Sequence, residues 1–201
     1  MRTTALIAAF GMLLGACATA RVETSWKDPA AGPSDFAFEK VLVMVRVTDG
    51  TARRAGEDEL VRFLMSGPRG QAGQLTADSS YRMLDDSDLA DRQKARALVE
   101  AQDFDGLVMM SFVSAQEKVT VQPASYGTVW GYYGARAIVS DPGYVRTDTI
   151  LRVETTIYRI SDGKLLWTGI SRALNPRDVP DLVRDVAKSV GEELRGQGLI
   201  P

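Results

Sequence analysis

The residues of this sequence whose types and spacing could do chemistry are two short acidic runs. The run DDSD spans residues 85–88, and the run DFD spans residues 103–105. Paired carboxylates held several ångströms apart across a cleft can hydrolyse glycosides, and clustered carboxylate oxygens can bind calcium. Both runs flank a predicted helix, and Asp88 would provide the cap at its amino end. We therefore interpret them as structural, and we keep a carboxylate-dependent hydrolase acting on cell-wall glycan as the alternative function.

Histidine is absent from all 201 residues. Its absence excludes Ser-His-Asp and Cys-His catalysis, histidine general bases and the usual zinc sites. Carboxylate, lysine and tyrosine chemistry are what remain for an enzyme. We expect a protein that is not an enzyme and that uses no metal or diffusible cofactor.

The single cysteine, Cys17, follows a short apolar segment. Arg2 gives a positive start, and residues 5–14 (ALIAAFGMLL) are apolar throughout. A spanning helix needs about 20 apolar residues, so this segment is too short to be one. A positive start, a short apolar core and then small residues are the pattern of a secretory signal peptide. The stretch LGAC, residues 14–17, resembles the bacterial lipobox, in which the cysteine thiol receives a diacylglycerol.

This motif predicts that the signal peptide, residues 1–16, is removed and that Cys17 becomes the first residue. Cys17 would then carry a diacylglycerol on sulfur and an acyl chain on its amino group, and several acyl chains anchor a protein stably. An aspartate after the cysteine tends to retain Gram-negative lipoproteins in the inner membrane, so Ala18 favours the outer membrane. The alternative is an ordinary signal peptide cut after Ala18 or Ala20.

The remaining chain has the size and charge of one ordinary domain. The whole sequence has 24 basic and 26 acidic residues, and removal of residues 1–16, with Arg2, leaves a net charge of −3. No basic excess indicates a nucleic-acid partner. We expect residues 17–36 to be a lipidated segment and linker, and residues 37–201 to be a single α/β periplasmic domain.

Hydrophobic patterns predict the elements of that domain. Strands are predicted over residues 40–47, 74–81, 106–121, 148–160 and 165–173, and helices over residues 52–65, 89–102 and from Asp178 onward. The stretch 40–47 is almost continuously apolar, as expected of a central strand covered on both faces. The second helix is expected to bury Ala95, Leu98 and Val99, and the apolar residues of the last helix follow helical spacing. The Asp162-Gly163 turn between the last two strands is a strong hairpin signal. The order predicts an α/β fold: a mixed sheet of three parallel strands extended by an antiparallel hairpin, with about three packing helices.

One segment, residues 123–143, differs in composition from the rest because it is rich in glycine and aromatic residues. Its candidate contact residues are Tyr126, Trp130, Tyr132, Tyr133 and Arg136. Tyr, Trp and Arg are enriched at binding hot spots. The segment could dock a partner protein, stack on a peptidoglycan sugar or enter the membrane interface, where Trp and Tyr settle. The alternative is that it folds back and covers one face of the sheet.

Several short motifs occur in a characteristic order along the chain. They are TSWKDP, KVLVMV, GYYG, PGYVRTDT, SDGKLLWTG and an NP pair before the last helix. In this combination the chain resembles a family of uncharacterised proteobacterial lipoproteins, over nearly its full mature length. The resemblance implies no activity, and it transfers no functional residue except Cys17.

The order of elements is also similar to periplasmic domains of the curli-secretion lipoprotein, the peptidoglycan-synthase activator lipoproteins and the amino-terminal domain of the Tol-system β-propeller protein. Fold does not determine function, but this fold-level similarity favours an adaptor or assembly role. The sequence thus predicts a membrane-anchored, non-enzymatic binding or assembly module on the periplasmic face of the outer membrane. Its expected partners are the membrane, through the anchor, and an envelope protein or peptidoglycan.

The anchor can be tested by removing the thiol. In the Cys17→Ser variant no acyl chain can be attached to the side chain, so we expect the protein to leave the membrane fraction and to lose its function. Cell fractionation and immunoblotting would measure this release. An unchanged membrane-bound fraction would contradict lipidation of Cys17.

Overall fold

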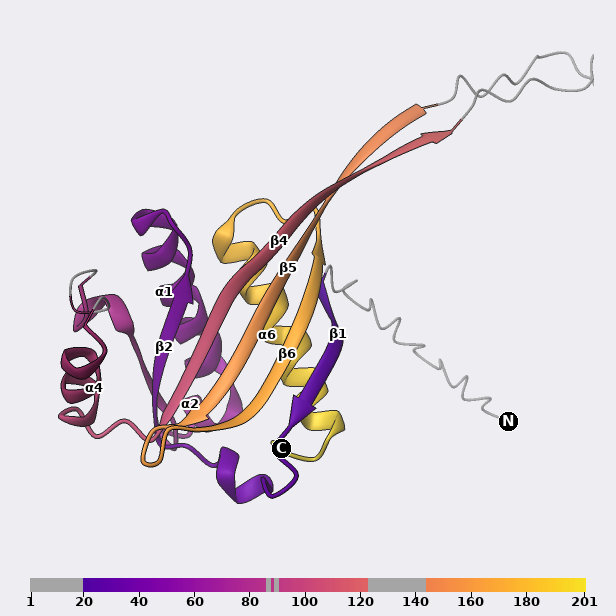
Figure 1. Ribbon diagram of the computed structural model, residues 1–201. Coiled ribbons are helices and arrows are strands. Elements are labelled where there is room, and N and C mark those ends of the chain that lie inside the picture. Colours follow the sequence, from indigo (N-terminus) through magenta and orange to yellow (C-terminus); the bar gives the residue numbers. More distant parts are fainter. Residues whose placement is uncertain (1–19, 86–87, 89–90, 123–143) are drawn as a thin grey trace, which may run out of the picture.

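The computed structural model describes residues 20–85, 88, 91–122 and 144–201. Its six strands form one sheet in the order β1-β6-β5-β4-β2-β3 (Figure 1). The strands are β1 (Ala20–Lys27), β2 (Lys40–Arg46), β3 (Thr76–Ser79), β4 (Gly106–Gln122), β5 (Tyr144–Arg159) and β6 (Lys164–Leu174). The helices are α1 (Gly50–Ser66), α2 (Pro68–Gln71), α4 (Arg92–Glu100) and α6 (Val179–Gly196), with short 3-10 turns η1 (Pro33–Phe36) and η2 (Ser80–Arg82).

The sheet joins a parallel part to an antiparallel part. β2 pairs in parallel with β3 on one side and with β4 on the other. The pairs β4–β5, β5–β6 and β6–β1 are antiparallel. The predicted α/β class and mixed sheet are confirmed. The arrangement differs in detail from the predicted one, because a further strand, β1, extends the antiparallel part.

β1 lies in the segment that was predicted to be a linker, residues 17–36. From Ala20 onward this segment pairs with β6, from Ala20 opposite Ala173 to Lys27 opposite Trp167. Most of its side chains are exposed, because β1 is an edge strand with one neighbour. A polar edge strand lacks the apolar signal of a buried strand. Its strand conformation therefore depends on a partner far away in the sequence.

One face of the sheet holds the core. α1 and α6 lie side by side on this face (Figure 1). Alternate β2 residues, Val41, Val43 and Val45, are buried under the two helices, as predicted for a central strand. The apolar stripe of α6 is buried as its helical spacing predicted, at Leu182, Val183, Val186, Ala187, Val190 and Leu194.

A buried carboxylate of α1, Glu57, connects this helix to β2 and to η2. Its Oε1 accepts hydrogen bonds from Arg53 Nε at 3.0 Å, Ser80 Oγ at 2.8 Å and the backbone N–H of Val45 at 3.2 Å. Its Oε2 accepts from the backbone N–H of Tyr81 at 2.9 Å. A fully buried charge is stable only when it is paired and hydrogen-bonded in this way. Glu57 therefore fixes α1 against β2 and η2.

The opposite face of the sheet is covered only in part, by α4. Leu42 of β2 is buried there, but the next side chain on this face, Met44, is only half-buried. The residues of α4 that were predicted to be buried, Ala95, Leu98 and Val99, are half-buried as well. The prediction that β2 is covered on both faces is therefore correct at Leu42 and wrong from Met44 onward. A groove separates α4 from the sheet at this point.

α4 begins later than predicted, and its cap is Asp91 instead of Asp88. The Asp91 carboxylate accepts hydrogen bonds from the backbone N–H groups of Gln93 and Lys94 at 3.0 and 3.1 Å. Asp88 instead exchanges side chain-to-backbone hydrogen bonds with Asp85. Either aspartate is a good cap by residue type. The reciprocal turn with Asp85 decides which of them is used.

The two tryptophans in described strands have different environments. Trp167 of β6 is fully buried, whereas Trp26 of the edge strand β1 is 47% exposed. The six-membered ring of Trp167 lies directly over Gly169, where a Cβ atom would overlap it. Gly169 is therefore required by the ring that covers it.

This contact predicts the effect of a single methyl group. Gly169→Ala should displace the Trp167 ring and lower the free energy of unfolding by about 1–3 kcal/mol, the usual cost of overpacking. Gly32→Ala is the matched control, since a Cβ at Gly32 has no neighbour within 4 Å. Urea unfolding followed by circular dichroism would measure both. Equal midpoints for the two variants would contradict the contact.

Candidate functional site at the β4–β5 arm

β4 and β5 continue together beyond the rest of the sheet. β2 last pairs with β4 at Arg46 and Ser111, and β6 last pairs with β5 at Leu174 and Ile150. Past these points β4 and β5 pair only with each other among the described strands. We call residues 113–122 and 144–149 the arm. Figure 1 shows it rising as a two-stranded ribbon well clear of the helices.

The arm forms because both strands keep an alternating, β-favouring sequence after their neighbours end. The stretches EKVTVQ and YVRTDT contain valine and threonine at alternate positions. A bulge between Phe112 and Ser114 lies at the base of the arm, and bulges increase strand twist. Phe112 and Val113 are exposed there, at 46% and 51%. A two-stranded ribbon alone is only marginally stable in water. A partner that packs on the arm would therefore stabilise it.

The two faces of the arm differ in polarity. Val119 lies opposite Thr147, and Val145 lies on the same face as Thr147 because side chains alternate along a strand. Val119 and Val145 are 58% and 66% exposed. The other face has Lys118 opposite Asp148. Among the described residues of the arm, the one charged residue on the valine face is Glu117, which lies opposite Thr149 at the base. The arm is therefore an amphipathic ribbon with exposed valines on one face.

Asn175 fastens the base of the arm to the body. It follows the last residue of β6 and has a left-handed backbone, with φ of 50°. Its backbone N–H donates to the carbonyl of Thr149 at 2.9 Å, and its Oδ1 accepts from the N–H of Thr149 at 2.7 Å. Asn tolerates this backbone conformation better than other residues with side chains. In the sequence Asn175 stands out only as a helix-start signal, because its partner Thr149 lies on β5.

The charged face of the arm is neutralised internally. Asp148 accepts hydrogen bonds from Asn175 Nδ2 at 2.8 Å and from Arg146 Nε at 2.7 Å. The hydrogen bond from Asn175, followed by that from Arg146, holds the pKa of Asp148 below its usual value. Asp148 is therefore ionised at neutral pH and compensates Arg146.

The predicted site residues Cys17, Tyr126, Trp130, Tyr132, Tyr133 and Arg136 all lie outside the described residues. The described strands nevertheless fix where the aromatic segment starts and stops. Gln122 pairs with Tyr144, so both ends of residues 123–143 begin at the tip of the arm. The arm is thus the described element to which the segment singled out from the sequence is joined at both ends.

Three carboxylates of the acidic runs, those of Asp85, Asp88 and Asp105, bind backbone N–H groups. The fourth that the structure describes, Asp103, is exposed. Asp85 and Asp88 bind each other's N–H groups at 2.8 and 3.0 Å, and Asp88 also forms an ion pair with Lys94. Asp105 accepts from the N–H groups of Glu39 and Lys40 at 2.7 and 3.0 Å, which fixes the start of β2. Among the described residues, no group of three or more His, Cys, Asp or Glu side chains could hold a metal ion.

The groove between α4 and the sheet has a volume of about 1280 Å³. Its floor includes Met44 and Met109 of the sheet, and its wall includes Ala95 and Val99 of α4. Arg46 is among the charged residues at its rim. The sequence did not predict that Met44 lies at a groove, because the almost continuously apolar stretch of β2 predicted a strand covered on both faces.

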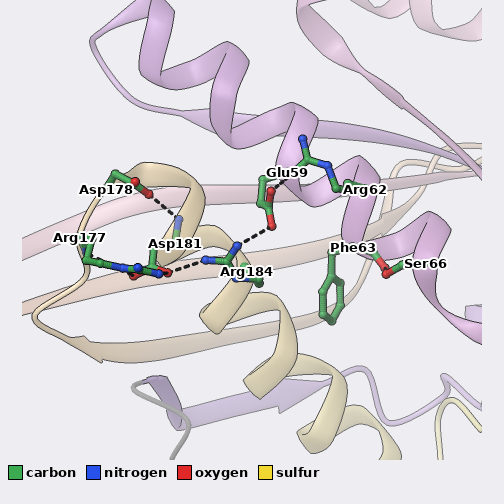
Figure 2. Close-up of polar contacts among 8 residues, drawn as sticks. All are labelled: Glu59, Arg62, Phe63, Ser66, Arg177, Asp178, Asp181 and Arg184. Atoms are coloured by element: carbon green, nitrogen blue, oxygen red, sulfur yellow. Dashed lines mark hydrogen bonds and ion pairs between the residues drawn. The ribbon is translucent and has the colours of Figure 1, made fainter. Parts of the chain in front are cut away.

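A chain of ion pairs joins α1 to the start of α6 (Figure 2). Glu59 of α1, only 6% exposed, pairs with Arg62 on its own helix and with Arg184 of α6 at 3.3 Å. Arg184 also pairs with Asp181, and Asp181 binds Arg177 at 2.7 Å. The hydrogen bond from Arg177, assisted by that from Arg184, holds the pKa of Asp181 far below its usual value of 3.8.

Side chains also satisfy backbone groups at the amino end of α6 and in the last turn of α1. Asp178 Oδ1 accepts from the N–H of Asp181 at 2.8 Å and so caps α6. Near the end of α1, Ser66 Oγ donates to the carbonyl of Phe63 at 2.8 Å, and Figure 2 shows both residues beyond the ion pairs. The ion pairs position α6 against α1. The charged residues in this region therefore have a structural role.

None of the described helices has the length and apolar composition needed to cross a membrane.

Comparison with known proteins gives fold likenesses at low identity. No protein-family model matches the chain, and no curated protein matches it. The PelC dodecamer of Paraburkholderia phytofirmans is similar in two crystal forms, with TM-scores of 0.45 and 0.42 and identities of 12% and 11%. These alignments cover 83% and 85% of this chain, and 93% and 94% of PelC. Lipoprotein GNA1162 from Neisseria meningitidis has a TM-score of 0.38 and 13% identity, covering 78% of this chain and 98% of its own.

The lowered pKa of Asp181 predicts a pH-dependent contribution to stability. Stability from a carboxylate whose pKa is lowered by folding is present above its usual pKa and is lost as pH falls through the folded value. Asp181→Asn should therefore lower the free energy of unfolding at pH 7 by about 0.5–1 kcal/mol, since its arginine partners are partly exposed. The difference from the wild type should shrink below the usual pKa of 3.8.

Urea unfolding at pH 7 and pH 3 would measure this difference. Glu192→Gln, an exposed position on the same helix, is the control for loss of one negative charge. An Asp181→Asn effect equal to that of Glu192→Gln at pH 7 would contradict the assigned ion pairs.

Proposed function

We propose that this chain is a lipid-anchored, non-enzymatic binding or assembly module of the bacterial envelope. It is held through Cys17 on the periplasmic face of the outer membrane, and it binds an envelope protein or peptidoglycan. The observation that carries the proposal is the arm, because its tip, where Gln122 pairs with Tyr144, lies away from the helices and is joined in sequence to residues 123–143.

The lipobox-like stretch at residues 14–17 supports the anchor. Only Ala18 and Thr19 separate Cys17 from β1, which begins at Ala20. The anchor therefore leads almost directly into the sheet, without a long linker between the membrane and the folded domain. Such a short tether keeps the body of the protein close to the membrane surface.

The chemistry of the described residues supports a binding role over a catalytic one. The sequence has no histidine, and Asp85, Asp88 and Asp105 of the acidic runs accept hydrogen bonds from backbone N–H groups. The arm, in contrast, exposes valines and leads into a segment with Tyr126, Trp130, Tyr132, Tyr133 and Arg136. Aromatic residues and arginine are the residue types that dominate binding energy at interfaces.

Photocrosslinking in living cells would test the contact surface. A crosslinking residue would replace Trp130 or Tyr132, in the wild-type background and together with Cys17→Ser, and adducts would be identified by mass spectrometry. We expect one dominant envelope protein or a glycan adduct in the wild-type background, and its loss when the anchor is removed.

The matched control is the same crosslinking residue at Glu192, which is exposed on α6 in the body of the protein. Equal adducts at Glu192 and at the two aromatic positions would show non-specific crosslinking. An absence of adducts from Trp130 and Tyr132, in a folded and anchored protein, would overturn the segment as the contact surface.

A further inference from the structure

The chain enters the sheet at the same end from which the arm leaves it. Ala20, the first residue of β1, lies opposite Ala173 of β6, and Ala173 lies opposite Leu151 of β5. The arm begins just beyond Leu151, at residues 144–149. Figure 1 shows the start of β1 at the end of the body from which the arm rises. β1 then runs away from the arm toward Lys27.

The arm reaches farther in this direction than the tether that precedes β1. Three residue steps separate Cys17 from Ala20, which gives at most roughly 10 Å of extended chain. Six residue steps separate Ile150 from Tyr144, and at 3.3 Å per residue the strand extends about 20 Å. Anchoring at Cys17 therefore brings the membrane within reach of the arm.

We propose that the arm lies against the anchoring membrane, with its Val119 and Val145 face in contact with the bilayer. This inference rests on the proposed lipidation of Cys17. It goes beyond the proposed function because it identifies a second membrane contact, made by protein side chains. The surface that the arm contacts is then the bilayer.

The chemistry of the arm fits the interfacial zone of a bilayer. Val119 and Val145 expose apolar side chains on one face, and contact with lipid removes this area from water. The free strand edges can keep hydrogen bonds to water there, which the hydrocarbon centre would not allow. The arm is thus suited to lie at the surface and not to cross the membrane as a single ribbon.

The charges of the arm indicate that the contact is apolar and not electrostatic. Arg146 is compensated by Asp148, which also lies opposite Lys118. Glu117, opposite Thr149, lies on the valine face nearer the base of the arm. The described arm therefore has two basic and two acidic residues. Binding to anionic headgroups requires a cluster of uncompensated lysine or arginine residues, which the described part of the arm lacks. The contact should therefore form on neutral phosphatidylcholine as well as on vesicles that contain phosphatidylglycerol.

Site-specific fluorescence on the lipidated full-length protein would test the contact. Cys17 is the only cysteine and its thiol is alkylated in the lipidated form, so an introduced cysteine is the only free thiol. Val145→Cys and Thr147→Cys place the environment-sensitive dye NBD on the valine face. Ser161→Cys places it in the exposed turn at the other end of β5.

In phosphatidylcholine vesicles we expect the labels at positions 145 and 147 to shift their emission to shorter wavelength. They should also be quenched by nitroxide lipids and protected from aqueous iodide, unlike the label at position 161. Adding Val119→Asp and Val145→Asp to Thr147→Cys should abolish the shift while the protein still floats with the vesicles.

Flotation distinguishes failure of this inference from failure of the anchor. Protein that floats with vesicles but has equal iodide quenching at positions 145, 147 and 161 would overturn the arm contact and leave the proposed anchor intact. Protein that does not float would overturn both. A shift that appears only with phosphatidylglycerol would overturn the apolar contact in favour of headgroup binding.

Discussion

The antiparallel pairing of β4 with β5 is the constraint on which the rest of the structure depends. It runs from Gly106 opposite Arg159 to Gln122 opposite Tyr144. At one end it joins the parallel strands β2 and β3 to the antiparallel strands β6 and β1, so it holds the two parts of the sheet together. At the other end it continues alone as the arm. The same ladder of hydrogen bonds thus builds the body and supports the surface that projects from it.

Packing on the sheet is uneven. α1 and α6 bury one face and are held by the Glu57 contacts and by the ion pairs from Glu59 to Asp181. α4 covers only part of the other face and leaves a groove above Met44 and Met109. The charged groups of these contacts therefore hold elements of the body in place. Asp85, Asp88 and Asp105, whose types suggested catalysis, likewise have structural partners.

The position of β1 determines which end of the fold is next to the predicted anchor. Because β1 begins at the base of the arm, the predicted anchor and the arm share one end of the molecule, while the β5–β6 turn at Gly163 and the carboxyl end of α6 lie toward the other. A protein tethered at Cys17 would then present the arm to the membrane and the rest of the body to the periplasm. The short tether makes this orientation a consequence of chain length.

The sequence by itself determined the elements whose signals are local. The apolar stripe of α6, the valines of β2 and the turn at Asp162 and Gly163 follow from spacing and turn chemistry, and the α/β class follows from their order. Only the tertiary structure decided the rest. β1 is a strand because β6, far away in sequence, pairs with it, and the arm exists because β2 and β6 end before β4 and β5 do. β4 does change from the apolar GLVMMSF inside the sheet to the more polar EKVTVQ in the arm, but both stretches are typical of a paired strand, so only the positions of the neighbouring strands show where the arm begins.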